Sequence, residues 1–121
     1  MKGIILSSGR GTRLNPITFL CQKQLLPIYD KPMIYYAMSL HLLLGIRDIA
    51  IVVTPQAYRA LNSLLGNGKD LGISIKYVIQ TESECFGIPY AIKLCKQFIM
   101  NEEFVVVLGD TILYGAELTN Y

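Results

Sequence analysis

The residues that could do chemistry gather directly after a short apolar run at the start of the chain. The run Gly3 to Leu6 is followed by SSGRGTRLNPIT, residues 7–18, which contains two glycines, a threonine and an arginine. Glycine lets an anion approach the main chain because no Cβ stands in the way, and Arg13 would add a permanent charge with bidentate hydrogen bonding. Backbone N–H groups of such a turn can face an anion, so the stretch predicts a phosphate-binding loop.

Two common phosphate-binding motifs are excluded, and a simpler alternative stays open. A Walker A loop needs the spacing G-x-x-x-x-G-K-[ST], which the sequence lacks. A dinucleotide fingerprint needs a third glycine, but Leu14 stands in its place, and the second apolar run ends in Val53 and Thr54 with no acid for a ribose. NAD is therefore a poor candidate. Taken alone, the glycine-rich stretch is equally compatible with a turn that carries a solvated arginine.

Alternating apolar runs and stretches of helical length predict the elements that would position this loop. Four runs rich in β-branched residues predict strands over 2–7, 48–54, 73–79 and 104–108. Three stretches of helical character lie between them, over 31–44, 55–65 and 89–98. Pro55 and Pro89 stand in the first turns and Gly45 follows the first helix, as helix boundaries favour. The alternation predicts an α/β fold, a Rossmann-like doubly wound parallel sheet with strand order 3-2-1-4.

This topology places residues that are far apart in the sequence at one edge of the sheet. In the order 3-2-1-4 the first and fourth strands are neighbours, and ligands bind there, beyond the carboxyl ends of the strands. The loop after the first strand holds residues 8–13, and the loop after the fourth holds Asp110. We therefore expect the glycine-rich anion loop and a carboxylate to lie side by side.

Composition narrows the possible functions and the compartment. With 121 residues, 52% of them apolar, and a mean hydropathy of +0.40, the chain is one domain at most and has apolar surface to spare. A net charge of +2 without a basic cluster argues against nucleic-acid binding. The longest apolar stretch, 33–46, contains polar residues and is shorter than the roughly 20 residues of a membrane span. Cys21, Cys85 and Cys95 form no metal-binding pattern, which favours reduced thiols in the cytoplasm.

A longer pattern that begins at Gly9 resembles the signature of the sugar nucleotidyltransferases. Residues 9–36 read GRGTRLNPITFLCQKQLLPIYDKPMIYY, which contains the family segments GxGTRL, KxLLP and KPMIYY. The version KQLLPIYDKPMIYY is most similar to glucose-1-phosphate thymidylyltransferases. The resemblance continues through LLLGIRDIAIVVTPQ and LLGNGKDLGISIKYVIQ to VVVLGD, so it covers essentially all of residues 1–121.

The resemblance implies a reaction and two catalytic residues. The family joins a nucleoside triphosphate to a sugar 1-phosphate and releases pyrophosphate; for this branch the substrates are dTTP and glucose 1-phosphate, with Mg²⁺ as cofactor. By similarity, Arg13 lies against the triphosphate and Lys23 contacts the phosphates of both substrates. Asp110 would bind Mg²⁺, which prefers one or two carboxylates together with phosphate oxygens and water.

The resemblance also implies a set of nucleotide-binding positions. Gln80 would read the pyrimidine edge, because its amide offers one donor and one acceptor to the base. The positions implied by similarity are Ser8, Gly9, Gly11, Thr12, Arg13, Gln80, Gly87 and Asp110. Departures from the family pattern lie at the nucleoside end: Ser7 and Ser8 replace small residues, Pro89 removes a backbone donor, and Thr111 replaces an asparagine.

Family members run to roughly twice this length or more, which affects what the chain can be expected to do. The resemblance implies that 1–121 is the amino-terminal, nucleotide-binding part of the domain, with sugar-binding segments and a second metal-binding aspartate outside it. We therefore expect the chain to be inactive alone and to need the missing part or a homo-oligomeric partner. A non-catalytic nucleotide-binding or subunit-interaction module is the alternative class, and uridylyltransferase-type specificity is the nearest rival among enzymes.

Overall fold

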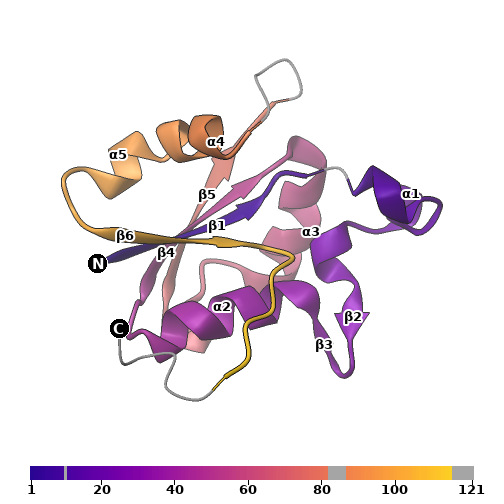
Figure 1. Cartoon of the computed structure of the whole chain (residues 1–121), viewed down its shortest axis with the longest axis horizontal. Helices are drawn as coiled ribbons and strands as arrows, with labels where there is room; N and C mark the ends of the chain where they lie inside the picture. Colours follow the sequence, from indigo (N-terminus) through magenta and orange to yellow (C-terminus); the bar gives the residue numbers. More distant parts are fainter. Residues whose placement is uncertain (10, 82–86, 116–121) are drawn as a thin grey trace.

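A four-stranded parallel sheet organises the chain (Figure 1). The structure is a computed structural model and describes residues 1–9, 11–81 and 87–115. The strands are β1 (Lys2–Ser7), β4 (Asp48–Val53), β5 (Ser74–Ile79) and β6 (Phe104–Leu108). Their order in the sheet is β5-β4-β1-β6 and all three pairings are parallel, which confirms the predicted order 3-2-1-4.

The central strands are apolar because both of their faces are covered. Every residue of Ile49–Val53 is fully buried, as are Ile4 and Ile5 of β1. A strand that is buried on both faces has no need of polar alternation, which is why β4 reads as an unbroken apolar run. The register pairs Ile5 with Ile51 on one side and with Val107 on the other, so the middle of the sheet is a continuous apolar layer.

Helices cover the sheet on two faces (Figure 1). On one face α2 (Met33–Leu43) and α3 (Pro55–Leu65) pack over the larger apolar core. On the other, α4 (Ile88–Leu94) and α5 (Lys96–Ile99) cover a smaller one. Among the described residues, none of these helices is both long and apolar enough to cross a membrane.

The predicted helix over 89–98 is wrong in one respect, because the structure contains two short helices with a break at Cys95. The N–H of Cys95 donates to the carbonyl of Ile92 at 2.9 Å, a three-residue spacing that tightens the turn. Cys95 is fully buried between the two helices. Periodicity alone could not locate this break, since apolar residues continue through it.

The connection between β1 and α2 is more ordered than the sequence predicted. A loop was expected there, but the described residues contain short elements: 3-10 helices η1 (Thr12–Leu14) and η2 (Lys23–Leu25), the helix α1 (Ile17–Leu20), and a hairpin of β2 (Pro27–Ile28) and β3 (Lys31–Pro32). A further 3-10 turn, η3 (Lys69–Leu71), precedes β5. Each element is too short to give a periodic pattern, so tertiary contacts must define it.

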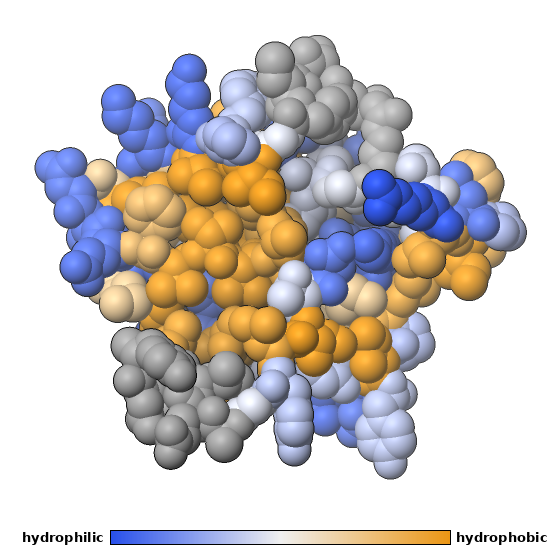
Figure 2. Space-filling model, in the orientation of Figure 1, coloured by the Kyte–Doolittle hydropathy of each residue, from blue (hydrophilic) through white to orange (hydrophobic). Residues whose placement is uncertain are grey.

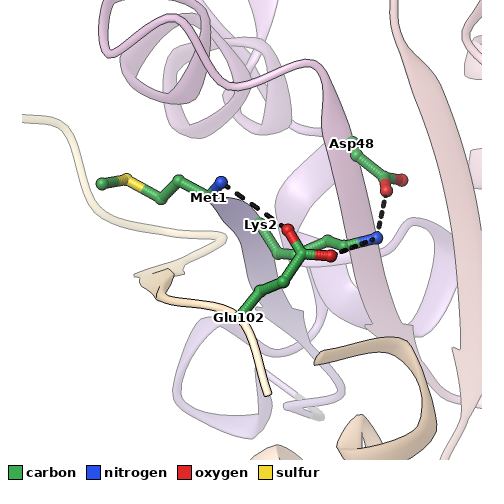
Figure 3. Close-up of polar contacts among 4 residues, drawn as sticks. All are labelled: Met1, Lys2, Asp48 and Glu102. Carbon is green, nitrogen blue, oxygen red and sulfur yellow. Dashed lines mark hydrogen bonds and ion pairs between the residues drawn. The ribbon is translucent and has the colours of Figure 1, made fainter. Parts of the chain in front are cut away.

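A small ion-pair cluster fastens the amino-terminal ends of the strands (Figure 3). The Lys2 ammonium lies 2.5 Å from an Asp48 carboxylate oxygen and 3.6 Å from Glu102, and the amino-terminal nitrogen of Met1 lies 3.8 Å from Glu102. The hydrogen bond to Asp48 is the main cause that raises the pKa of Lys2. The cluster joins β1, β4 and the segment before β6 at the end of the sheet opposite the predicted site.

His41 on α2 is a fully buried part of the fold. Its Nδ1 lies 3.0 Å from the carbonyl oxygen of Ala37, and its Nε2 lies 3.3 Å from that of Val105, so the ring links α2 to β6. A Cβ at Gly3 would stand 2.5 Å from the ring, which explains the glycine in the middle of β1. His41 therefore has a structural role.

Alkaline pH is expected to destabilise the fold through one partly buried and one buried group. Burial raises the pKa of Tyr77 from 10.0 to about 12 and that of the Cys95 thiol from 9.0 to about 11. Because the folded state holds both protons more tightly than the unfolded state, the stabilisation is complete below about pH 9 and is lost as the pH rises to 12. Urea unfolding between pH 8 and pH 12 should show this fall. In a Tyr77→Phe variant, the decrease in the free energy of unfolding between pH 10 and pH 12 should be smaller. An unchanged pH dependence in that range would contradict the assignment to Tyr77.

Candidate functional site

A cavity of about 310 Å³ opens beyond the carboxyl ends of β1 and β6, against the first turns of α4. This is the place where the strand order predicted a ligand. Its walls are formed by Leu6, Ser8, Gly9, Gln24, Gln80, Gly87, Ile88, Ala91, Leu108 and Asp110. Five of the residues implied by the sequence resemblance, Ser8, Gly9, Gln80, Gly87 and Asp110, therefore share one cavity.

Lys23 and Asp110 are in direct contact although 87 residues separate them in the sequence. The Lys23 Nζ donates to the Asp110 Oδ2 at 2.6 Å. Both side chains keep access to solvent, with exposed fractions of 29% and 37%. A cation suited to phosphate and a carboxylate suited to a metal thus meet at the cavity wall and neutralise each other.

Gly11 holds Lys23 in this position by close packing. Its φ of 65° lies in the left-handed region, and a Cβ there would stand 3.2 Å from the Cβ of Lys23 and 3.0 Å from Thr18 Cγ2. The Thr18 hydroxyl donates to the carbonyl of Gly11 at 2.9 Å, which closes the turn. The glycine is therefore needed both for the backbone conformation and for the space that the lysine stem occupies.

Gln80 and Gly87 lie in the cavity wall, after β5 and before α4. Gln80 follows β5 and is 2% exposed, and its backbone N–H donates to the carbonyl of Val53 at 2.8 Å. Gly87 precedes α4 with φ 139° and ψ 155°, a conformation that side chains rarely adopt. The glycine at this position therefore has a backbone reason and no steric one, since a Cβ there would meet only Pro89 Cδ, at 3.8 Å.

Gln24 is a site residue that the sequence reasoning missed. It lies on η2, is 4% exposed and lines the cavity, and its Oε1 has no hydrogen-bond partner among the described residues. A buried amide oxygen without a partner is costly, so a donor from a bound ligand would satisfy it. The signal was available in the pair Lys23-Gln24, where a second polar residue directly precedes the apolar Leu25 and Leu26.

Four of the predicted residues do not line the cavity: Gly11, Thr12, Arg13 and Lys23. Thr12 and Arg13 lie on η1, both exposed and outside the cavity wall. Arg13 nevertheless lies on the turn that begins at Gly11. Gly11 itself packs against the aliphatic part of the Lys23 side chain. The arginine is thus attached to the same loop as the lysine, on the solvent side.

Comparison with known proteins decides the family. The family model described as nucleotidyl transferase matches residues 2–121. The chain belongs to the nucleotidyl transferase family.

Relatives of this nucleotidyl transferase chain are longer than it is. It is 50% identical over 119 residues to glucose-1-phosphate thymidylyltransferase of Neisseria meningitidis and 45% identical over 118 residues to that of Mycolicibacterium smegmatis. In each case the match covers 98% of this chain, but only 41% and 40% of the relative. The chain therefore spans about two fifths of the curated relatives.

Solved structures agree with the fold. A putative glucose-1-phosphate thymidylyltransferase from Bacillus anthracis superposes with a TM-score of 0.93 at 40% identity, covering 100% of this chain and 48% of that one. A UDP-glucose pyrophosphorylase superposes with a TM-score of 0.81 at 29% identity, covering 98% of this chain and 50% of that one.

A magnesium ion fits the chemistry of this nucleotidyl transferase site with phosphate as co-ligand. Among the described residues, Asp110 is the single carboxylate in the cavity wall, and no group of three or more metal-ligating side chains occurs. Mg²⁺ usually keeps several waters and is held by one or two carboxylates plus substrate phosphates. Asp110 therefore provides enough ligands for Mg²⁺ only when the phosphates of a bound nucleotide provide the others.

Ser7 is expected to weaken the fold rather than serve the site. It is fully buried at the end of β1, and its Oγ has no hydrogen-bond partner in the part of the chain that the structure describes. Burying a hydroxyl without a partner costs free energy that an apolar methyl group does not. Replacing Ser7 with alanine should raise the free energy of unfolding by about 1 kcal/mol, measured by urea denaturation. A Ser8→Ala variant, at the neighbouring cavity position, is the matched control and should change stability less.

Proposed function

We propose that this chain supplies the triphosphate-binding part of an enzyme that transfers a thymidylyl group from dTTP to glucose 1-phosphate. The observation that carries the proposal is the contact of Lys23 with Asp110 at 2.6 Å on the wall of a cavity that also contains Gln80 and Gly87. The names of the two relatives reported above support the same reaction.

The proposed reaction requires positioning and charge neutralisation more than covalent chemistry by the protein. A phosphate oxygen of the sugar attacks the α-phosphorus of the nucleotide, and pyrophosphate leaves. Lys23 would bind phosphate oxygens, and Arg13 would approach the triphosphate from the solvent side of the loop. Asp110 would hold Mg²⁺, which supplies further charge neutralisation on the phosphates when bound. Lys23 must leave Asp110 for both contacts to form.

Base selection is assigned to the opposite wall of the cavity. The Gln80 amide could accept from N3–H and donate to O4 of a pyrimidine, and these groups are common to thymine and uracil. Gly87 would allow the main chain to approach the nucleoside. Since a UDP-glucose pyrophosphorylase is among the similar structures, competition between dTTP and UTP is the measurement that separates the two specificities.

The chain alone is proposed to lack turnover. It spans about two fifths of its curated relatives, and the cavity wall of the described part offers one carboxylate. The test is pyrophosphate release from dTTP, glucose 1-phosphate and Mg²⁺, by this chain alone and by this chain mixed with the segment of the Neisseria meningitidis relative that lies outside the matched region. We expect no turnover alone and turnover in the mixture. Turnover of the chain alone at the rate of the full-length relative would contradict the proposed half-site.

The alternative from another class is a non-catalytic nucleotide-binding module. It would bind Mg·dTTP without turnover in any mixture. A complex of the two segments that forms and binds dTTP, but releases no pyrophosphate, would favour this alternative over the enzyme.

A further inference from the structure

A polar cavity of about 580 Å³ lies at the amino-terminal ends of β4 and β5, away from the functional site. Figure 2 shows a broad hydrophobic surface over β6 and the segment that follows it, and the polar cavity belongs to a different part of the sheet. Ser74 begins β5 and Gln80 follows it, so the two cavities lie at opposite ends of this strand. The rise of six strand residues separates them by roughly 20 Å.

The polar residues that line this cavity are mainly hydrogen-bond donors. Arg47 and Lys69 carry positive charges, Asn67 carries an amide and Ser74 a hydroxyl, and all four residues are exposed. The N–H of Ser74 donates to the carbonyl of Arg47 at 2.8 Å, which keeps these two residues beside each other. Donors from the end of α2, from the turn before β5 and from β5 itself therefore surround one space.

Asn67 is held so that its side chain offers donors to the cavity. Its Oδ1 accepts from the backbone N–H of Lys69 at 3.0 Å, so the hydrogens of its Nδ2 group are left for another partner. Its carbonyl accepts from the N–H of Ile75 at 2.9 Å, which fixes the turn against β5. The position of this amide is thus set by the backbone on both sides of it.

Arg47 is also held in place. Its Nη1 donates to the carbonyl of Leu42 at 3.0 Å and to that of Ile46 at 3.2 Å, at the end of α2. Its Nε and Nη2 groups have no hydrogen-bond partner among the described residues. These two groups form an edge of the guanidinium that can donate to two oxygens of a phosphate side by side.

The charge that the cavity presents is positive. Asp48 is the single carboxylate among the described residues that line it, and its Oδ2 lies 2.5 Å from the ammonium of Lys2. Lys69 forms no ion pair within the described part of the chain. Asp70, its neighbour on η3, is exposed and does not line the cavity. An anion would therefore meet two available cations and a carboxylate that is already paired.

We propose that this cavity binds a phosphate group, either as the free ion or as the phosphate of a phosphomonoester. A phosphate carries more than one negative charge near neutral pH and accepts several hydrogen bonds at once, which fits two cations, an amide and a hydroxyl. A metal cation would be repelled by Arg47 and Lys69. The two cavities share no lining residue, so binding here does not depend on the proposed function.

Amide chemical shifts test the site without relying on activity. The isotope-labelled chain is titrated with inorganic phosphate at constant ionic strength, with chloride as the control anion. We expect saturable shifts at Lys69 and Ser74 that chloride does not produce. Phosphate in the functional cavity is followed separately at Gly9 and Asp110, and Lys23→Ala should weaken only that second binding.

Two asparagine variants that change the charge equally locate the bound anion. Asn67→Asp keeps the acceptor for the Lys69 N–H but adds a carboxylate to the cavity, so the dissociation constant measured at Ser74 should rise at least about tenfold. Asn62→Asp adds the same charge at an exposed position of α3 that does not line the cavity, and it should change this constant far less. Thermal unfolding of each variant shows that the fold is kept.

A pair of lysine variants measures the contribution of the cation. Lys69→Ala should raise the dissociation constant for phosphate up to about fivefold. Lys96→Ala, at an exposed position of α5 outside this cavity, should leave it unchanged.

Glucose 1-phosphate, titrated in place of inorganic phosphate, separates the two forms of the ligand. Tighter binding of the ester at Ser74 would identify a phosphomonoester site, and binding of inorganic phosphate alone would identify a site for the free ion. Three outcomes would overturn the proposal. They are no saturable shift at Lys69 and Ser74 with either compound, an equal response to chloride, or equal weakening by Asn67→Asp and Asn62→Asp. Failure of dTTP to bind in the functional cavity would instead contradict the proposed function and leave this site unaffected.

Discussion

Replacing Lys23 with alanine is expected to change the affinities for nucleotide and for metal in opposite directions. The dissociation constant for Mg·dTTP should rise about 30-fold, since a charged hydrogen bond of about 2 kcal/mol is lost. The dissociation constant for Mg²⁺ alone should fall, up to about fivefold, because Asp110 loses the ammonium that lies 2.6 Å from it. Titrations followed by NMR measure both constants on the same sample.

Lys31→Ala is the matched control for this result. Lys31 also forms an ion pair with an aspartate, at 3.0 Å from Asp30, but it is 55% exposed and Asp30, unlike Asp110, does not line the cavity. It should leave both affinities unchanged. If Lys23→Ala lowered both affinities together, the lysine would support the structure of the site and would not compete with the metal for Asp110.

The strand order and the approach of Asp110 to the loop after β1 could be predicted because both follow from long, consistent patterns. Four apolar runs with intervening helices allow few arrangements of a parallel sheet, and the preferred one makes the first and last strands neighbours. Asp110 then has to lie beside the loop that follows β1. The sequence resemblance added the lysine, which no periodicity could have indicated.

The rest could not be predicted because it depends on contacts between residues without a pattern. The break at Cys95 arises where apolar residues continue through a tightened turn. Gln24 is buried by the position of η2 against Gly109, where a Cβ would stand 3.2 Å from its Cγ. The placement of Arg13 outside the cavity wall follows from the turn at Gly11, whose conformation is fixed by packing.

Replacing Asp110 with asparagine should reverse the effect of Mg²⁺ on nucleotide binding. Without metal, the variant should bind dTTP about threefold more tightly, because a carboxylate that repels the triphosphate is gone and Lys23 is released. With Mg²⁺, it should bind at least about 100-fold more weakly, since loss of an outer-shell partner alone costs 10–100-fold in metal affinity. Titrations in EDTA and in Mg²⁺ measure the two constants. Asp70→Asn, at an exposed aspartate on η3 that is outside the cavity wall, is the control and should change neither.

The double variant Lys23→Ala with Asp110→Asn distinguishes a shared ligand site from two independent ones. If each residue acted alone, the changes in binding free energy would add. Since each side chain neutralises the other in the free protein, we expect the double variant in EDTA to bind dTTP more weakly than the sum of the single effects predicts. The lysine is more costly to lose when the carboxylate that sequesters it is already absent, because the released ammonium then contributes its full contact to the phosphate. Additivity in EDTA within about 0.3 kcal/mol would mean that the contact between them is incidental to nucleotide binding.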